Sequence, residues 1–531
     1  MNHYLFKYAI EQSRDIFLEK KVRSLHCHPF GIYSISFYDT NKRLYFSLSP
    51  QNSFLMPFED KLKDEIKDCP NFMMFLSKKL KGLRLTGIQQ SYSERVVYFI
   101  LEDKRGHIVY EYRLVFEIMG RLANLILTDG EGAVIQAYKY TDSSRQIAPK
   151  KPYIPPVSNM PDILKDDEAL LVLKYRHNED ILGLSGHLRR FLTDERMFLG
   201  FVRSARDAFE KRSFELHLYP KNEVYPFYMP ISVRRVDNGF LYNMFIEKPQ
   251  RVEFDNIKSN LRRVFTRRLN SLKRRLEKVR GELKKAEDYD KFRIYAENLF
   301  ARPNLKVGYE GFVEVEDLYT KESIKIPINP ELNIFENAQN FYKKYKKAKH
   351  SIEIVKQRLI QTEEEIGFIR QLLFDLEQAT TVDDVESIKS IAQKEGLIKL
   401  PLKPKKRKGL DYLPYEHMVI EGYDAYVGKN AYGNDIVSLK LASKNDLWFH
   451  AKGIAGSHVV LKVPSKLQDV DDSVKIKAAR IAACRSGAKK LEMVDVDYTQ
   501  AKYVKKPKNA KTGMVIYSNF KTIRVRKDEC S

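Results

Sequence analysis

The fold of this chain is decided by residues 334–376, IFENAQNFYKKYKKAKHSIEIVKQRLIQTEEEIGFIRQLLFDL, in which apolar side chains recur every three or four positions. The seam contains one polar member and runs through Ile334, Ala338, Phe341, Tyr345, Ala348, Ile352, Val355, Leu359, Thr362, Ile366, Ile369, Leu373 and Leu376. A repeat of this length predicts a coiled-coil helix, which needs a second helix to cover its apolar seam.

A second apolar seam upstream supplies the partner helix. It consists of Leu269, Leu272, Leu276, Val279, Leu283 and Ala286. The segment between the two helices, GFVEVEDLYTKESIKIPI (311–328), is rich in β-branched residues and predicts strands. Residues 251–400 are therefore expected to form a long antiparallel coiled-coil arm with a small β excursion at its tip.

The first helix of this arm is strongly basic. Between residues 256 and 285, twelve Lys and Arg stand against two acids, Glu277 and Glu282, a net charge of 12 − 2 = +10. A charge run on a coiled coil is usually a solvated face, but this excess repels itself unless an anionic partner is present. The side chains predicted to contact RNA here are Arg262, Arg263, Arg267, Arg268, Arg274 and Arg275.

The whole chain is basic as well. Its 531 residues carry a net charge of +23, which indicates a polyanionic partner, either nucleic acid or an acidic membrane surface. Its longest apolar runs are too short to cross a bilayer, and its opening residues lack the apolar block of a secretory signal. We therefore expect a cytoplasmic protein without a membrane partner.

The flanking regions predict a multidomain α+β chain. Residues 1–156 combine an opening helix with antiparallel strands, a mixed α/β N-terminal domain that ends in a proline cluster. Residues 157–250 are expected to form a helical module, with a helical pattern to about 235. The stretch 401–409 is a basic linker, and 410–531 are expected to form a compact α/β domain.

A Gly-Leu-Ser-Gly turn at 183–186 lies between two expected helices of the second region. A turn of this kind can present backbone N–H groups to a phosphate, as in helix-hairpin-helix modules. The alternative is a plain connection between helices.

The sequence lacks the cysteine spacing of a metal site and the known catalytic motifs. Four cysteines, at 27, 69, 484 and 530, show no CxxC spacing, which fits a reducing compartment and argues against a disulfide scaffold or a zinc ribbon. His26, Cys27 and His28 are neighbours on an expected strand, so their side chains alternate between faces and a shared metal is not expected. No Walker A, G-x-S-x-G, HExxH or dinucleotide motif is present. The chain is expected to be no enzyme and to hold no cofactor or metal.

The sharpest motif lies within residues 427–463. The strand period around Trp448 places Asp446, Trp448 and His450 on one face, with Leu447 and Phe449 on the other, core-facing side. An indole beside polar edges in a basic domain suits the stacking of splayed RNA bases. The alternative is that this single tryptophan is buried in the core. Composition alone favours neither the stacking role nor the core role.

The same run resembles the RNA-binding C-terminal domain of the NFACT family. That family's pattern has Gly-Lys/Arg-Asn, then Asn-Asp, then D-x-W-F-H-A and Gly-Ser-His-Val. The matching residues are Gly428-Lys429-Asn430, Asn434-Asp435, Asp446 to Ala451 and Gly456-Ser457-His458-Val459. Residues 71–99 and EIMGRLANLIL (117–127) resemble the family's N-terminal signatures, so the resemblance covers the whole chain.

Within the family, the chain is most similar to bacterial members that act in ribosome quality control. The resemblance implies an N-terminal domain, a helix-hairpin-helix module, a coiled-coil arm and an RNA-binding domain. It implies binding to a large ribosomal subunit that still holds an obstructed peptidyl-tRNA, and recruitment of alanyl-tRNA for untemplated alanine tailing. The tail marks the stalled chain for degradation. Ribosomal RNA forms the peptide bond in that process; DNA is not an expected partner.

The resemblance also implies two sets of contact residues. Those expected to bind tRNA are Glu94, Arg95, Glu117, Ile118, Met119, Gly120, Arg121 and Asn124. Those of the last domain expected to bind RNA or the ribosome are Lys429, Asn430, Asp446, Trp448, His450, Lys452, Ser457 and His458. The family's Asp-Arg pair falls on Glu94-Arg95, where the longer Glu displaces the acceptor while the Arg fork is retained. The alternative for this pair is a surface salt bridge of little energetic value.

Three other functions compete with this one. The family's N-terminal domain is similar in fold to formamidopyrimidine glycosylases, but their N-terminal proline and following Glu are absent here, where Asn2 and His3 stand. A fibronectin-binding surface adhesin is disfavoured by the missing signal segment. A ribosome-binding scaffold that recruits no aminoacyl-tRNA stays open, and the tRNA that copurifies with the protein would decide it.

Overall fold

The computed structural model describes residues 1–62, 65–66, 69–91, 95–142, 145–287, 289–306, 310–399, 412–464, 470–488 and 491–527. Two compact units are present, and their boundary in the sequence lies between Asp255 and Asn256. The predicted linker 401–409 lies outside the described residues. Within the described part of the chain, no helix is long and apolar enough to span a membrane.

The first unit opens with helix α1 (His3–Phe17), which is capped by the Asn2 side chain accepting the Leu5 N–H. Two antiparallel sheets follow, each in sequential strand order, as the alternating apolar pattern predicts. The first consists of β1 (Val22–His28), β2 (Ile32–Phe37), β3 (Lys42–Ser47) and β4 (Phe54–Glu59). The second consists of β5 (Arg84–Gln90), β6 (Val96–Arg105), β7 (Ile108–Glu117), β8 (Asn124–Asp129) and β9 (Val134–Ala137).

The two sheets share one apolar core with α1 and with helix α2 (Asn71–Leu80), which separates them in sequence. The phenyl rings of Phe46 and Phe116, one from each sheet, lie 5.2 Å apart. A hairpin joins β8 and β9 at Asp129, whose carboxylate accepts the N–H groups of Glu131 and Ala133 and closes the turn.

The next segment is helical only in part. Helices α3 (Glu168–Arg176), α4 (Gly186–Arg189) and α5 (Glu195–Glu210) match the prediction, but a small sheet follows where helix was expected to continue to about 235. Its strands are β10 (His217–Tyr219), β11 (Glu223–Tyr225) and β12 (Arg234–Arg235), followed by helix α6 (Asn238–Tyr242) and one π-helical turn (Asn243–Glu247). The aromatic side chains of this sheet pack on Tyr4 of α1, a tertiary contact that outweighs local helix propensity.

The glycine turn at 183–186 packs against the same aromatic cluster. Gly183 has φ +77°, and a Cβ there would lie 2.2 Å from Cε2 of Tyr4, so no other residue fits. The Tyr4 hydroxyl donates to the carbonyl of Leu182 over 2.6 Å, and the Tyr225 hydroxyl donates to that of Gly183 over 3.2 Å. The turn between α3 and α4 is thus held by the core of the first unit.

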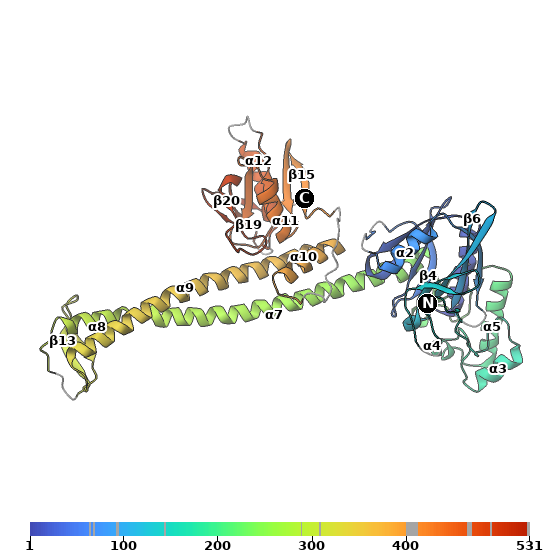
Figure 1. Ribbon diagram of the computed structural model, residues 1–531, viewed down its shortest axis with the longest axis horizontal. Coiled ribbons are helices and arrows are strands. Elements are labelled where there is room, and N and C mark those ends of the chain that lie inside the picture. Colours follow the sequence, from blue (N-terminus) through green and yellow to red (C-terminus); the bar gives the residue numbers. More distant parts are fainter. Residues whose placement is uncertain are drawn as a thin grey trace. The chain divides into compact units, whose positions relative to one another are not determined.

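The predicted arm is built from α7 (Lys248–Glu287) and α9 (Ile334–Gln378), which run side by side in Figure 1. They are antiparallel, because residue numbers rise on one helix as they fall on the other: Lys258 Nζ donates to Ala379 O over 2.8 Å, and Arg268 pairs with Glu365. All thirteen predicted seam positions of α9 are buried or half-buried. On α7, Leu272 and Val279 are buried and Leu269, Leu276 and Leu283 are half-buried, while the side chain of Ala286 lies outside the described residues.

The tip of the arm contains the predicted β hairpin, formed by β13 (Phe312–Glu316) and β14 (Ser323–Pro327). It also contains helix α8 (Asp290–Phe300), which was not predicted and which packs on the first turns of α9. The α9 helix begins with a capping box between Asn333 and Glu336.

The C-terminal part of the second unit is the expected compact α/β domain, preceded by helix α10 (Val382–Lys394). A six-stranded sheet has the order β15-β16-β18-β17-β19-β22. The strands are β15 (Tyr415–Ile420), β16 (Tyr423–Gly428), β17 (Leu447–Ala451), β18 (Val459–Leu461), β19 (Met493–Gln500) and β22 (Lys521–Arg526). Helix α12 (Asp472–Cys484) covers one face of the sheet with its alanines.

The opposite face of that sheet is covered by chain segments rather than by a long helix. They are α11 (Ala431–Ile436), the π-helical turn Val437–Leu441 and the short strands β20 (Val504–Lys505) and β21 (Ile516–Tyr517). Gly428 and Gly433 allow α11 to pack closely, since a Cβ would lie 2.1 Å from Asn434 Oδ1 or 1.8 Å from Pro414 O, respectively. Both faces of β17 are therefore buried.

The last turns of α9 are buried on nearly all sides because the C-terminal domain packs on them. Asp375 accepts the Ala431 N–H over 2.7 Å, and the Gln371 side-chain oxygen accepts the Gly456 N–H over 2.9 Å. These contacts join the arm and the sheet domain into one unit.

The cysteine prediction is wrong for the N-terminal domain. Cys27 of β1 is bonded to Cys69, 42 residues later, with their Cα atoms 5.8 Å apart, and none of the described cysteines is free. Sequence spacing could not reveal this pair, because folding brings the two residues together. Among the described residues, no group of His, Cys, Asp and Glu could hold a metal ion.

Candidate nucleic-acid interface

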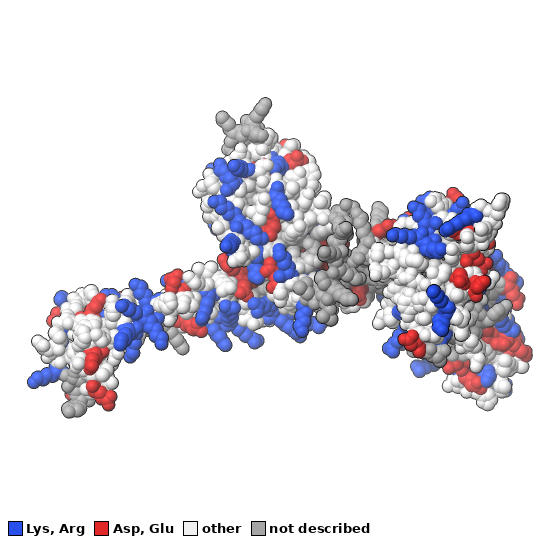
Figure 2. All heavy atoms as spheres, in the orientation of Figure 1, with Lys and Arg blue, Asp and Glu red and all other residues white. Residues whose placement is uncertain are grey.

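The six arginines predicted to contact RNA on α7 are all exposed. Figure 2 shows Lys and Arg side chains gathered along the arm. Only Arg268 is neutralised within the structure. Among the described residues, Arg262, Arg263, Arg267, Arg274 and Arg275 make no ion pair. Five uncompensated guanidinium groups on one helix form a surface suited to a phosphate backbone.

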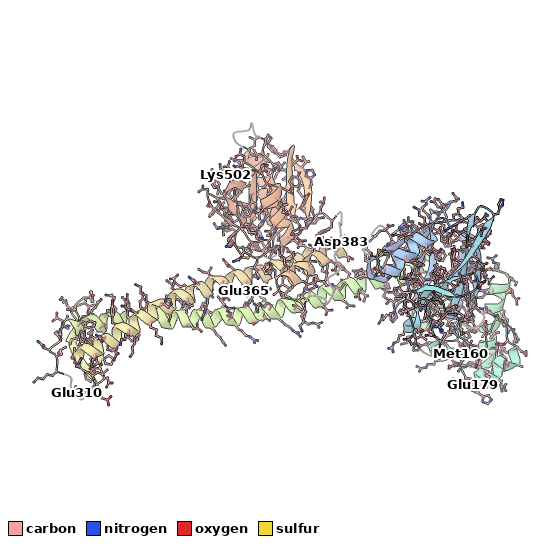
Figure 3. All side chains as sticks on the ribbon, in the orientation of Figure 1. Met160, Glu179, Glu310, Glu365, Asp383 and Lys502 are labelled. Carbon is pink, nitrogen blue, oxygen red and sulfur yellow. A yellow bond between two sulfur atoms is a disulfide. The ribbon has the colours of Figure 1, made fainter. Side chains whose placement is uncertain are left out.

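Two ion pairs connect α7 to α9, and their arginines differ in this respect from the five that make no ion pair among the described residues. Arg268 Nη2 lies 2.8 Å from Glu365 Oε2, and Arg280 Nη2 lies 3.0 Å from Glu363 Oε1. Figure 3 labels Glu365 on α9. These two arginines support the pairing of the helices, whereas the other five remain available to a partner.

The expected base-stacking face around Trp448 does not exist. The Trp448 side chain is 0 % exposed and lies among Val437, Val460 and Val504. Its ring also contacts Tyr517, with centroids 4.8 Å apart. The predicted strand period is right, since Leu447 and Phe449 face the core on the other side, but the second face of β17 is covered as well. Trp448 is a core anchor.

The polar residues of this motif form a buried network around the indole. Trp448 Nε1 donates to Ser438 Oγ over 2.9 Å, and Ser438 Oγ lies 2.8 Å from His458 Nδ1. The His458 N–H donates to Asn434 Oδ1, whose amide in turn donates to Gly456 O. Each buried polar atom in this chain of contacts has a partner, which is what a stable core requires.

Burial also determines the charge of the two histidines. It lowers the pKa of His450 to about 4, against the opposing effect of Asp497. Burial and the neighbouring His450 lower the pKa of His458 well below its usual value. Both rings are therefore neutral at physiological pH and contribute no positive charge to an RNA interface.

Three further motif residues are also buried and serve the fold. Asp446 accepts Lys462 Nζ over 2.6 Å and the Val463 N–H over 3.0 Å. Asn430 caps α11 by accepting the Gly433 N–H. Ser457 donates its backbone N–H to the carbonyl of Arg485. The prediction that these residues contact RNA is therefore corrected: the side chains of Asp446 and Asn430 make their hydrogen bonds inside the domain, and Ser457 is only 6 % exposed.

Two lysines of the predicted set remain accessible. Lys429 is half-buried beside Tyr412, with its Nζ 5.9 Å from the ring centroid. Lys452 is exposed, and its Nζ lies 5.3 Å from the ring of Phe520 and 3.6 Å from Asp497. Phe520, which is 46 % exposed, was not predicted. Only its position next to Lys521 in a basic segment could have indicated it.

Some of the predicted tRNA-binding residues are buried and hold the fold together, whereas others lie at the surface. Glu94 lies outside the described residues. Arg95 is half-buried; its Nη1 donates to Met1 O over 2.6 Å, and its carbonyl accepts the Ile118 N–H. Glu117 is fully buried, where Arg145 and the Tyr153 hydroxyl donate to its carboxylate. Ile118 and Arg95 are thus brought together, although only Arg95 offers a polar side chain.

The rest of the signature forms a short loop between β7 and β8. Asn124 is buried and pairs with the backbone of Lys139 in both directions, so it is part of the framework. Met119 is half-buried, and the Gly120 N–H donates to Ser53 Oγ. Arg121 is exposed. Of the eight predicted residues, Arg95 and Arg121 are therefore the cationic side chains that could reach a phosphate.

Two family models match the chain in order. The model for the NFACT N-terminal and middle domains matches residues 32–194 and 219–410, and the model for the NFACT protein RNA-binding domain matches residues 415–519. Two curated relatives are each named "Rqc2 homolog RqcH". The protein from Bacillus subtilis is 28% identical over 502 residues, covering 86% of each chain. The one from Streptococcus pneumoniae (strain D39) is 28% identical over 484 residues, covering 86% of this chain and 85% of that protein.

Among solved structures, the C-terminal part of a fibronectin/fibrinogen-binding protein from Streptococcus suis is 28% identical, with a TM-score of 0.41. The match covers 52% of this chain and 96% of that one. The family models cover well over half of the chain, and the segments that they match include most strands of the described sheets, the arm and most of the C-terminal domain. The chain therefore belongs to the NFACT family.

Proposed function

We propose that the protein is a cytoplasmic ribosome-associated quality-control factor. It binds a large ribosomal subunit that carries a stalled peptidyl-tRNA, and it recruits alanyl-tRNA for untemplated alanine tailing of the nascent chain. The protein is not itself the catalyst; ribosomal RNA forms the peptide bond. The observation that carries this proposal is the match of both NFACT models, in order, together with relatives named Rqc2 homolog RqcH over 86% of the chain.

The described geometry supports a division of labour. The exposed arginines of α7 and the accessible Lys429 and Lys452 of the C-terminal domain suit contacts to ribosomal RNA phosphates. The N-terminal unit contributes Arg95 and Arg121, whose guanidinium groups suit tRNA. Subunit docking and tRNA recruitment would then depend on different residues.

The test is a double variant, Glu94→Ala/Arg95→Ala, in cells that accumulate stalled chains. We expect the loss of tRNA copurification and of alanine tails, measured by RNA sequencing and mass spectrometry, while co-sedimentation with large subunits is retained. The matched control is Glu111→Ala/Arg113→Ala, which removes a half-exposed ion pair of 2.9 Å from β7 of the same unit. We expect the melting curve of the double variant to match that of the unaltered protein, which would show that Arg95 is not needed for folding.

Normal tailing by the double variant would show that the pair is a surface ion pair only. Loss of subunit binding as well would contradict the division of labour. Subunit binding without any copurified tRNA in the unaltered protein would favour a scaffold that recruits no aminoacyl-tRNA.

A further inference from the structure

A cavity of about 790 Å³ lies at the tip of the arm, apart from every surface described above. Phe341 and Ile328, each 8 % exposed, form its apolar base. Phe292 and Tyr295 of α8 are half-buried at its side. The Tyr295 ring meets Phe341 edge-on with centroids 5.4 Å apart, and the Phe292 ring lies parallel to Phe341 at 6.2 Å. The cavity thus presents aromatic rings to whatever enters it.

The wall formed by residues 328–333 is fixed by one buried side chain. The Asn337 amide donates to the carbonyls of Asn329, Leu332 and Asn333 over 3.0–3.1 Å. Its oxygen accepts the Asn329 N–H over 2.8 Å. All the hydrogen-bonding capacity of this amide is used to hold the loop, so the cavity is preformed rather than a gap between mobile segments.

The rim of the cavity is positively charged. Lys291, Lys343, Lys344 and Lys347 line it and are exposed. None of the four makes an ion pair within the part of the chain that the structure describes, and the sequence has no acid between Asn337 and Ile352. Arg293 on the same helix α8 is, by contrast, neutralised by Asp290 and Glu297.

The charges and the rings are close to one another. Lys344 Nζ lies 5.4 Å from the centroid of Phe341, and Lys291 Nζ lies 5.7 Å from that of Phe292. Flat apolar faces beside several lysines match the two chemical parts of a nucleotide, a base and a phosphate. The Tyr295 hydroxyl has no hydrogen-bond partner among the described residues, and Asn340 also lines the cavity. Both can bond to the edge of a base.

We propose that this cavity binds an unstacked nucleotide of single-stranded or looped RNA. The base lies against Phe292 and Tyr295, and the adjoining phosphates lie among Lys343, Lys344 and Lys347. The inference rests on the proposed function in that RNA is the ligand, and it adds a second RNA site to the arm. An acidic peptide would also satisfy the lysines, but it would leave the aromatic faces and the free hydroxyl without a specific partner.

The experiment uses the full-length protein and a short oligouridylate that contains 4-thiouridine, crosslinked by light and mapped by mass spectrometry. We expect crosslinks in the segments that hold Phe292, Tyr295 and Phe341. Tyr295→Leu keeps the apolar volume but removes the ring and the hydroxyl, and it should lower the crosslink yield at the tip about tenfold. Lys343→Ala/Lys347→Ala should reduce the salt slope of that yield by about 1.4, the value for two contacts to a single strand.

The matched control is Lys346→Ala/Lys349→Ala. It removes the same charge from the same turns of α9, at lysines that lie over Tyr342 and Tyr345 rather than at the cavity. Crosslinking at the tip should persist in this variant. Equal loss in the two lysine variants would reduce the site to a general field effect and overturn the proposal.

Two further outcomes overturn it. Crosslinks on α7 or the C-terminal domain alone would mean that the cavity takes no nucleotide. Loss of binding to a polyglutamate peptide in Lys343→Ala/Lys347→Ala, with unchanged RNA crosslinks, would identify an acidic protein partner instead. Co-sedimentation of each variant with large subunits is measured in parallel. If the unaltered protein binds subunits but gives no crosslink at the tip, the cavity proposal is wrong and the proposed function stands. If the unaltered protein does not bind subunits, the proposed function is contradicted.

Discussion

Ser438 is the residue on which the buried network around Trp448 depends. Its hydroxyl oxygen accepts the indole N–H and contacts His458 Nδ1, so Ser438→Ala leaves two buried polar atoms without partners. We expect a loss of about 1–3 kcal/mol in the free energy of unfolding of the C-terminal domain. Trp448 is the only tryptophan in the chain, so its fluorescence during denaturant unfolding reports this domain alone. The control is Ser473→Ala at an exposed position, which should change stability by less than about 0.5 kcal/mol. Equal midpoints for the two variants would contradict the role of the network.

Asp375 makes the stability of the second unit depend on pH. Burial raises its pKa from 3.8 to about 7, against the hydrogen bonds from Ala431 and Gln371 that favour the carboxylate. The folded state therefore holds a proton that the unfolded chain has released, and this contribution to stability is full below about pH 4 and lost as pH rises through 7. His450 acts in the opposite direction: its pKa falls from 6.5 to about 4, so its contribution is lost as pH falls below 6.5.

The comparison of Asp375→Asn with the unaltered protein separates these two effects. The variant should lose the decline in stability between about pH 4 and pH 7 and keep the acid-side decline due to the histidines. Thermal unfolding followed by Trp448 fluorescence at a series of pH values measures it. Asp495→Asn, at a half-exposed strand position near Arg524, should leave the profile unchanged. Parallel pH profiles for Asp375→Asn and the unaltered protein would show that Asp375 does not titrate in this range.

Helix α7 is the element to whose two faces we assign separate tasks in the proposed function. Its seam pairs with α9, while five of its six arginines predicted to contact RNA make no ion pair among the described residues. Arg262→Ala/Arg263→Ala should lower the salt slope of RNA binding by about 1.5–2, since each lost phosphate contact removes about 0.7 from the slope for a single strand and about 0.9 for duplex DNA. Arg268→Ala/Arg280→Ala removes the same charge but acts on residues already paired with Glu365 and Glu363, and should have a smaller effect. Filter binding at several salt concentrations distinguishes the two; equal slopes would mean that α7 does not contact RNA directly.

At the scale of the whole molecule, we expect the net charge of +23 to govern the proposed binding to the large ribosomal subunit. If docking on the large subunit is mainly phosphate contact, log affinity should fall linearly with log salt, with a slope of at least about −4. Sedimentation binding of the full chain to purified large subunits measures this slope. A flat salt response would show that the contacts are predominantly apolar or directed to ribosomal proteins.

Periodic patterns made much of this protein predictable. The seam of α9, the β hairpin at the arm tip and the alternation of β17 follow from the spacing of apolar residues along the chain. That spacing reflects local geometry, 3.6 residues per helical turn and two per strand repeat. The basic face of α7 could be predicted for the same reason, because a helix surface is defined by residues close in sequence.

What only the tertiary structure decided was which surfaces distant segments cover. The sequence placed Asp446, Trp448 and His450 on one face of a strand, but it could not reveal that residues 437–441 and 504–517 close over that face. Likewise, the Cys27–Cys69 pair and the cavity at the arm tip bring together residues that are far apart in the chain. Burial is a property of such long-range packing, and a motif of polar and aromatic residues has the same local pattern whether it meets RNA or its own core.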